Sequence, residues 1–154
     1  MSDFTIRHPL RALTLIGLCV MVAACEEPPS ASPVPQAGAR WYDAEQVQQG
    51  STVFLQHCAT CHGEQAQGLV ADWRQKLDDG FFPPPPLNGT AHAWHHPRSV
   101  LLQVINEGGL EFGGRMPAFG AVLTETDKLA AIAYFQNFWD DEIYANWQQM
   151  GGSN

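Results

Sequence analysis

The N-terminal part of the chain is dominated by one uninterrupted apolar run. It covers residues 12–24 and follows two basic residues, Arg7 and Arg11. A run of this length is shorter than the roughly 20 apolar residues that span a bilayer as a helix. Basic residues before the run and small residues at its end are typical of a secretory signal peptide. We therefore predict that residues 1–24 direct export and are removed.

The first helical pattern follows a proline-rich segment, residues 25–40, that contains no aromatic residue and is predicted to be a tether. Asp43 and Gln46 have the spacing of an N-terminal cap and its partner. Beyond them, apolar or small residues from Val47 to Phe54 recur on one helical face. This pattern predicts a helix that starts after Asp43.

Two further helices are predicted downstream. Residues 99–107 have apolar positions at helical spacing and are followed by a pair of glycines that stops the helix. A third helix is expected at 124–139, where Thr124 and Asp127 form a capping pattern. Because every predicted element is a helix, the expected fold class is all-α.

The last apolar positions lie in a short acidic segment after the third helix. Asp140 starts this segment, and Ile143, Tyr144 and Trp147 are its apolar side chains. We predict that they fold back as an extra turn or helix and pack on the domain. A docking surface for a partner is the alternative, since exposed Trp and Tyr are common interface anchors.

The length of the chain supports one folded unit. After removal of the signal peptide about 130 residues remain, enough for one domain and not for two. We place that domain at residues 41–147 and expect 148–154 to be a flexible tail. No internal repeat appears along the chain.

The residues with the clearest chemistry are Cys58, Cys61 and His62, a C-x-x-C-H motif. Two thiols at this spacing can add to the two vinyl groups of one porphyrin, and the adjacent imidazole can bind its iron. Zinc sites and thioredoxin-like redox centres also use C-x-x-C pairs. Zinc would need two more ligands, for which His92, His95 and His96 are candidates. A thioredoxin-like pair would follow a strand of a βαβ unit, and no such pattern surrounds these cysteines. The immediate His favours haem.

A second motif, Gly-Gly-Arg-Met-Pro-Ala-Phe-Gly, occupies residues 113–120. Pro117 disfavours the helical conformation for Met116, and the glycines allow the backbone to approach a flat ligand closely. A thioether sulfur is a soft donor that suits haem iron. The alternative is that Met116 only fills space in the core, as flexible methionines often do.

Together the two motifs resemble the class I c-type cytochromes. The resemblance implies a small all-α fold of three to five helices around one covalently bound haem c. It implies that Cys58 and Cys61 form the thioether bonds, and that His62 and Met116 are the axial ligands of the iron. In this family the first and last helices cross near a glycine and an aromatic residue. The candidates are Gly50 and Phe54 on one side, and Ile132, Tyr134 or Phe135 on the other.

A proline run before the second helix matches the Pro-Pro-Leu-x-Gly element of the same family at residues 85–89. The resemblance implies that a proline carbonyl there accepts the hydrogen bond of His62 and sets its orientation. Pro85 and Pro86 are both candidates. Residues 70–79 exceed what the shortest family members need, so we expect a surface insertion.

The apolar run ends in Val-Ala-Ala before Cys25, which resembles the lipobox of bacterial lipoproteins. This resemblance implies a lipidated Cys25 as the first mature residue, each buried CH₂ contributing about 0.8 kcal/mol to membrane binding. An ordinary signal peptide with a chance cysteine is the alternative. The remaining Cys19 lies in the signal peptide, so no thiol is left for a disulfide. We expect a lipid-anchored protein that faces the periplasm of the bacterial cell envelope.

Three histidines lie close together after the proline run, at His92, His95 and His96. In the favoured interpretation they belong to a polar loop, with Trp94 packed at the haem edge or near a propionate. Two alternatives stay open: one histidine replaces Met116 as iron ligand, or the three form a separate copper or zinc site.

The net charge limits the partners. The formal net charge is −8, and removal of Asp3, Arg7 and Arg11 with the signal peptide takes it to −9. An acidic chain does not bind nucleic acid, and it binds anionic lipid head groups poorly. A basic or neutral docking site on a partner is favoured, although ordinary solubility explains the charge equally well.

These features predict a single-electron carrier that exchanges electrons with redox proteins, most naturally membrane-associated respiratory complexes. The sequence contains no acid-base pair or nucleophile arrangement, so we do not expect an enzyme. One alternative is a haem-relay subunit of a larger respiratory or oxidase complex, attached through Tyr144 and Trp147. Another is a haem sensor or enzyme in which Met116 detaches and a loop histidine acts as an acid or base.

Overall fold

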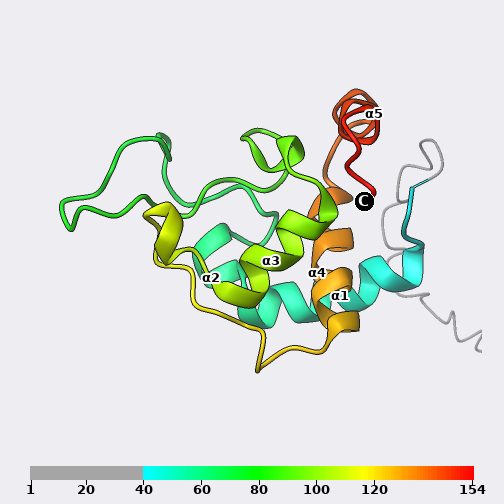
Figure 1. The fold of residues 1–154 in the computed structure, drawn as a ribbon, viewed down its shortest axis with the longest axis horizontal. Helices are drawn as coiled ribbons and strands as arrows, with labels where there is room; N and C mark the ends of the chain where they lie inside the picture. Colours follow the sequence, from blue (N-terminus) through cyan, green and yellow to red (C-terminus); the bar gives the residue numbers. More distant parts are fainter. Residues whose placement is uncertain (1–39) are drawn as a thin grey trace, which may run out of the picture. The chain divides into compact units, whose positions relative to one another are not determined.

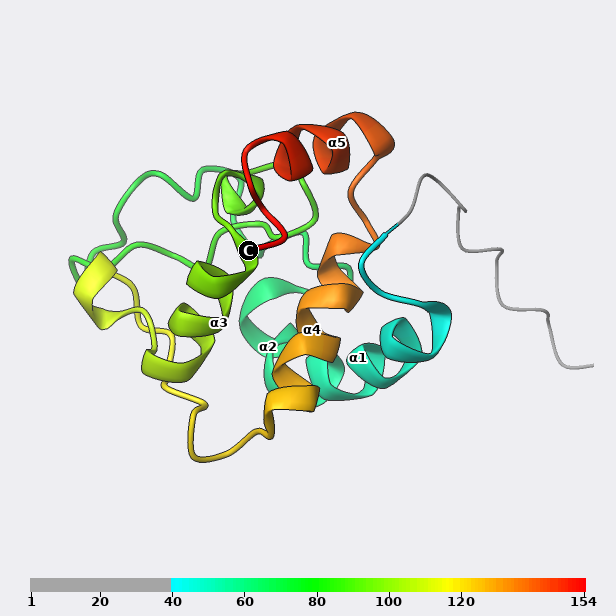
Figure 2. The same cartoon turned by 45° about the vertical axis from the view of Figure 1, so that its right-hand side comes forward.

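The computed structural model describes residues 40–154, and all of its regular elements are helical in that range (Figures 1 and 2). Its elements are α1 (Ala44–His57), α2 (Ala59–His62), the short 3₁₀ turn η1 (Ala93–His95), α3 (Arg98–Glu107), the 3₁₀ turn η2 (Leu110–Phe112), α4 (Glu125–Gln136) and α5 (Asp141–Gln149). The predicted all-α fold class is confirmed. The predicted signal peptide, Cys25 and all of the tether before Arg40 lie outside the described residues. From residue 40 onward, the helices are all too short or too polar to cross a membrane.

The N-terminal caps of α1 and α4 form as predicted. The Asp43 carboxylate accepts a hydrogen bond from the Gln46 N–H at 2.8 Å, and the Gln46 side chain accepts one from the Asp43 N–H at 3.1 Å. Thr124 and Asp127 make the same reciprocal pair at the start of α4. Such caps satisfy N–H groups that the first helical turn leaves without partners.

Helices α1 and α4 form the main contact of the fold, and they cross at a glycine. A Cβ on Gly50 would collide with the carbonyl group of Ala130, so the two backbones meet directly there. One turn later the rings of Phe54 and Tyr134 lie 5.1 Å apart. The predicted crossing at Gly50 and Phe54 is therefore confirmed, and of the three candidates on the other helix Tyr134 is the one whose ring meets Phe54. Ala130, which lets the two backbones approach, was not among the predicted residues.

Helix α4 ends at Gln136, three residues before its predicted end. The chain then turns and buries the Trp139 ring, which is 2% exposed. The indole N–H of Trp139 donates to the Leu87 carbonyl at 2.7 Å. Asp140 then caps α5 by accepting a hydrogen bond from the Ile143 N–H at 2.8 Å. The helix stops early because burying Trp139 and starting α5 require a turn at this point.

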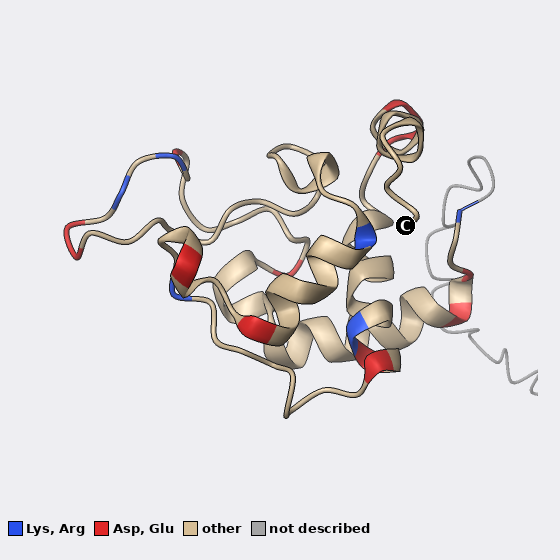
Figure 3. Ribbon diagram, in the orientation of Figure 1, with Lys and Arg blue, Asp and Glu red and all other residues tan. Residues whose placement is uncertain are grey.

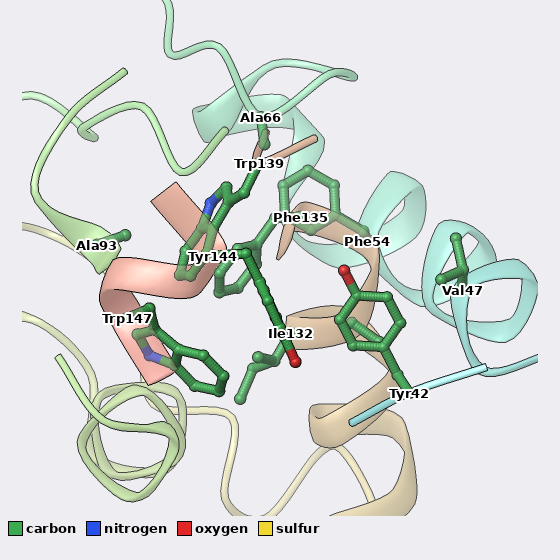
Figure 4. Packing of buried hydrophobic residues seen from close by; sticks show 11 residues of the cluster. Tyr42, Val47, Phe54, Ala66, Ala93, Ile132, Phe135, Trp139, Tyr144 and Trp147 are labelled. Atoms are coloured by element: carbon green, nitrogen blue, oxygen red, sulfur yellow. The ribbon is translucent and has the colours of Figure 1, made fainter. Parts of the chain in front are cut away.

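Helix α5 packs on the domain through Tyr144 and Trp147, which are 3% and 0% exposed. Figure 4 shows these rings beside Trp139, and the Trp147 ring centre is 5.3 Å from that of Tyr144 and 5.9 Å from that of Trp139. The indole N–H of Trp147 donates to the His96 carbonyl at 2.8 Å. The packing role predicted for these side chains is confirmed.

The segments on either side of the predicted domain also contact it. Arg40, assigned to the tether, donates to the Trp139 carbonyl at 3.1 Å and lies over the Tyr144 ring. The sequence predicts a flexible tail at residues 148–154. In the structure, backbone carbonyls of this segment accept hydrogen bonds from the start of α3. The N–H groups of Arg98 and Ser99 donate to the carbonyls of Gly152 and Asn154 at 2.7 and 3.1 Å. The domain in this structure therefore extends beyond residues 41–147.

The predicted insertion, residues 70–79, contains no helix and is exposed except at Trp73, which is half-buried. Figure 1 shows this green loop projecting away from the helices. Figure 3 shows charged residues gathered on this loop and near helix ends, while the middles of the helices carry few. The predicted surface position of these residues is confirmed, and their being an insertion relative to shorter family members stays a prediction.

Candidate haem site

The C-x-x-C-H motif occupies the junction between α1 and α2. The N–H groups of Cys61 and His62 both donate to the Cys58 carbonyl, at 3.1 and 2.9 Å, so the motif forms a single tight turn. Both cysteines are free thiols, Cys58 half-buried and Cys61 exposed. Burial, aided by the nearby Cys61, raises the pKa of Cys58 to about 11, so this thiol stays protonated at neutral pH. The turn presents two thiols and one imidazole from one short segment.

The His62 ring is oriented by a backbone carbonyl. His62 is only 8% exposed, and its Nδ1–H donates to the Pro85 carbonyl at 2.9 Å. Nδ1 therefore carries the ring proton, and the lone pair of Nε2 is available to bind a metal. Burial lowers the pKa of His62, and the bond to Pro85 opposes that effect. Of the two prolines that the sequence left open, the structure places Pro85 at this bond, while Pro86 packs beside Gly68.

Two aromatic side chains, one in α4 and one just after it, hold the segments around His62. The Tyr134 hydroxyl donates to the Glu64 carbonyl at 2.8 Å. The Trp139 indole donates to the Leu87 carbonyl, two residues after Pro85. Sequence reasoning missed both bonds, because an aromatic residue on a helix indicates core packing and does not reveal where its polar atom points.

Met116 is half-buried and lies on the loop that runs from α3 to α4, coloured yellow in Figures 1 and 2. We call residues 113–120 of this loop the methionine loop. Its carbonyl accepts a hydrogen bond from the Gly109 N–H at 2.9 Å. Gly108 has φ +87°, and a Cβ there would lie 2.7 Å from the Met116 carbonyl oxygen. The glycine pair predicted as a helix stop therefore has a second role, since it lets the methionine loop approach the backbone at the end of α3.

The methionine loop also contacts the segment before the prolines. The Phe82 N–H donates to the Gly113 carbonyl at 2.8 Å, and Arg115 forms an ion pair with Asp79 at 3.0 Å. Both partners of the ion pair are well exposed, so we assign it little stabilisation. The backbone bond ties Gly113 of the loop to the segment before the prolines.

The three loop histidines lie around Trp73 and Trp94. His92 stacks on the Trp73 ring at 4.7 Å and meets the His96 ring edge-on at 5.4 Å, while His95 lies against Trp94. Burial lowers the pKa of His92 and of His96. Within residues 40–154 no three His, Cys, Asp or Glu side chains are arranged to hold a metal ion. The described part of the chain thus gives no support to a copper or zinc site.

The donor set fits a c-type haem. Two free thiols lie on one turn, the adjacent buried imidazole has Nε2 available, and a thioether is carried by a loop that backbone bonds attach to the end of α3. Thiols, imidazole and thioether are the groups that attach and coordinate a haem of this type.

Comparison with known proteins agrees with this chemistry. Residues 45–135 match the family described as cytochrome c oxidase, cbb3-type, subunit III. The chain belongs to this family of c-type cytochromes, which confirms the class predicted from its two motifs. A c-type haem is therefore its implied cofactor.

Two curated relatives are cbb3-type cytochrome c oxidase subunits. FixP of Azorhizobium caulinodans is 30% identical over 98 residues, and CcoP of Azospirillum brasilense is 32% identical over 95 residues. The matches cover 64% and 62% of this chain, and 29% of each relative. The similarity is thus limited to less than a third of each relative. No solved structure matches the chain.

Proposed function

We propose that this protein is a single-electron carrier of the bacterial cell envelope that holds one haem c. Cys58 and Cys61 attach the haem, and His62 and Met116 are the axial ligands. The observation that carries the proposal is the buried His62 imidazole, which donates from Nδ1 to Pro85 beside two free thiols. Metal-bound histidines characteristically donate their other ring nitrogen to an acceptor of this kind.

The haem, when bound, supplies a one-electron change of its iron, and the chain sets the conditions for it. Pro85 fixes the tautomer and orientation of His62. Met116 would be the second protein ligand of the haem iron, which would leave no open site for a substrate and would raise the reduction potential relative to a ligand set without Met. The chain thus favours electron transfer over catalysis.

Replacement of Met116 by Ala tests this ligand set. We expect the purified wild-type protein to be low-spin in both redox states, with the sulfur-to-iron absorption band in the oxidised form. The M116A variant should lose that band and bind carbon monoxide when reduced, because its sixth position is open. Met150, 54% exposed near the chain end, provides the matched control, and M150A should keep the wild-type spectrum. A wild-type protein that is high-spin would contradict the proposal.

A second candidate is a haem-relay subunit of a respiratory complex, favoured by the names of the curated relatives. Both candidates share the proposed signal peptide, the lipid on Cys25 and attachment to a membrane. A carrier should purify from detergent-solubilised membranes as one haem-containing band, whereas a relay subunit should purify with other subunits in fixed proportion. For the carrier, Cys25→Ser should move the protein out of the membrane fraction, and retention there would contradict the lipid anchor. A relay subunit should stay in the membrane fraction through its complex even without the lipid.

A further inference from the structure

The described residues contain one buried Lys or Arg side chain, that of Lys128, which is 5% exposed. It lies in the first half of α4. Burying an ammonium group is costly unless hydrogen bonds and opposite charges compensate for it. Lys128 plays no part in the haem attachment or axial ligation proposed above, so its burial needs a separate explanation.

The contacts of Lys128 join α4 to the last turn of α3. Its ammonium donates to the Asn106 side-chain oxygen at 2.6 Å and pairs with the Glu125 carboxylate at 2.7 Å. Glu125 is 62% exposed, so the pair with Glu125 is screened by water, whereas the bond to Asn106 is partly buried. The positive charge also lies beside the C-terminal turn of α3, where the helix dipole favours a cation.

The same turn of α3 carries the methionine loop. Two backbone hydrogen bonds join them: Phe119 N–H to the Ile105 carbonyl at 2.8 Å and Gly120 N–H to the Asn106 carbonyl at 3.2 Å. A third bond, from the Gly109 N–H to the Met116 carbonyl at 2.9 Å, starts two residues after the helix ends. Asn106 therefore accepts two hydrogen bonds. Its side-chain oxygen accepts one from Lys128, and its backbone carbonyl accepts one from Gly120 of the loop. A movement of this turn relative to α4 would move the loop that bears Met116.

We infer that Lys128 is a positioning residue for the Met116 sulfur: through Asn106 it holds the end of α3, and with it the methionine loop, at a set distance from α4. This inference rests on the proposed role of Met116 as an iron ligand. If the ammonium group is lost, we expect added ligands such as imidazole to displace Met116 from the iron more easily. Haem attachment at Cys58 and Cys61 should be unaffected.

The test is Lys128→Met in the full-length haem-loaded protein, because Met keeps most of the buried stem and removes the donor. We expect imidazole to displace Met116 with an affinity about tenfold higher than in wild type, the change expected when one hydrogen bond to a charged donor is lost. The reduction potential should fall with the strength of the sulfur ligand. Covalent haem content should stay at the wild-type level.

Three controls separate positioning from a general loss of stability. Glu125→Gln removes the exposed ion pair and keeps the Asn106 bond, so its imidazole affinity should match wild type. Val47→Ala removes buried volume in α1 and should lower the unfolding midpoint without changing the imidazole affinity. Asn106→Ala removes the acceptor and should reproduce the K128M effect. If K128M does not fold, the imidazole affinity of N106A tests the role of Lys128.

The outcomes distinguish this inference from the proposed function. If wild type lacks the sulfur-to-iron band, both are overturned. If wild type shows the band and K128M and N106A bind imidazole as wild type does, only the role of Lys128 is overturned. A tenfold effect shared by V47A would also overturn it, because the effect would then follow overall stability.

Discussion

Replacement of both Cys58 and Cys61 by Ser is expected to eliminate covalent haem from the protein. These are the two thiols within residues 40–154, and one turn of backbone holds them together through the bond from the Cys61 N–H to the Cys58 carbonyl. A Ser hydroxyl does not form the thioether, so the double variant should show no haem stain on a denaturing gel. Its intact mass should match the mature polypeptide with the lipid proposed for Cys25 and no haem.

The wild-type mass tests the number of haems in the same experiment. After the two Cys-to-Ser substitutions are allowed for, it should exceed the mass of the double variant by one haem, because both proteins carry the lipid proposed for Cys25. Thr60 lies between the two cysteines and is exposed, so Thr60→Ser is the matched control and should keep the full haem content. Haem stain that persists in the C58S/C61S variant would show that the attachment site lies elsewhere.

Replacement of Trp147 by Ala should lower the free energy of unfolding by about 3–5 kcal/mol, the usual cost of removing a buried large aromatic side chain. The ring is fully buried against Trp139 and Tyr144, and its removal leaves the His96 carbonyl without its 2.8 Å partner. Gly152 also packs directly on the indole, so the bonds from the chain end to α3 should weaken as well. Urea unfolding of the haem-loaded protein, followed by circular dichroism, measures the change.

Two matched variants separate the contributions of Trp147. Trp147→Phe keeps an aromatic ring and loses the indole N–H, so it should cost clearly less than W147A, with about 1 kcal/mol from the lost hydrogen bond. Phe138→Ala removes a ring that is 37% exposed and should cost less than either. If W147A unfolds at the wild-type urea midpoint, α5 does not stabilise the domain.

Local features were predictable because they depend on residues close together in the chain. Asp43 with Gln46 and Thr124 with Asp127 are pairs three residues apart, and both formed as capping boxes. The C-x-x-C-H turn is equally local, since its main-chain bonds join residues three and four apart.

Features that join distant segments were predicted less well. The choice of Pro85 over Pro86 depends on how the proline run lies against His62, 23 residues earlier in the chain. The early end of α4 depends on a bond from Trp139 to Leu87, 52 residues away. Sequence alone marked Trp139 as apolar and did not show which carbonyl its indole would reach.

The sequence by itself therefore determined the helical class, the start of each capped helix, and the groups of the candidate haem site, because each follows from short-range spacing and side-chain chemistry. Only the tertiary structure decided three further matters: the carbonyl that orients His62, the burial of Lys128 against Asn106, and the packing of residues 148–154 on α3. Each of these joins residues more than twenty positions apart, and their meeting depends on how the whole chain packs.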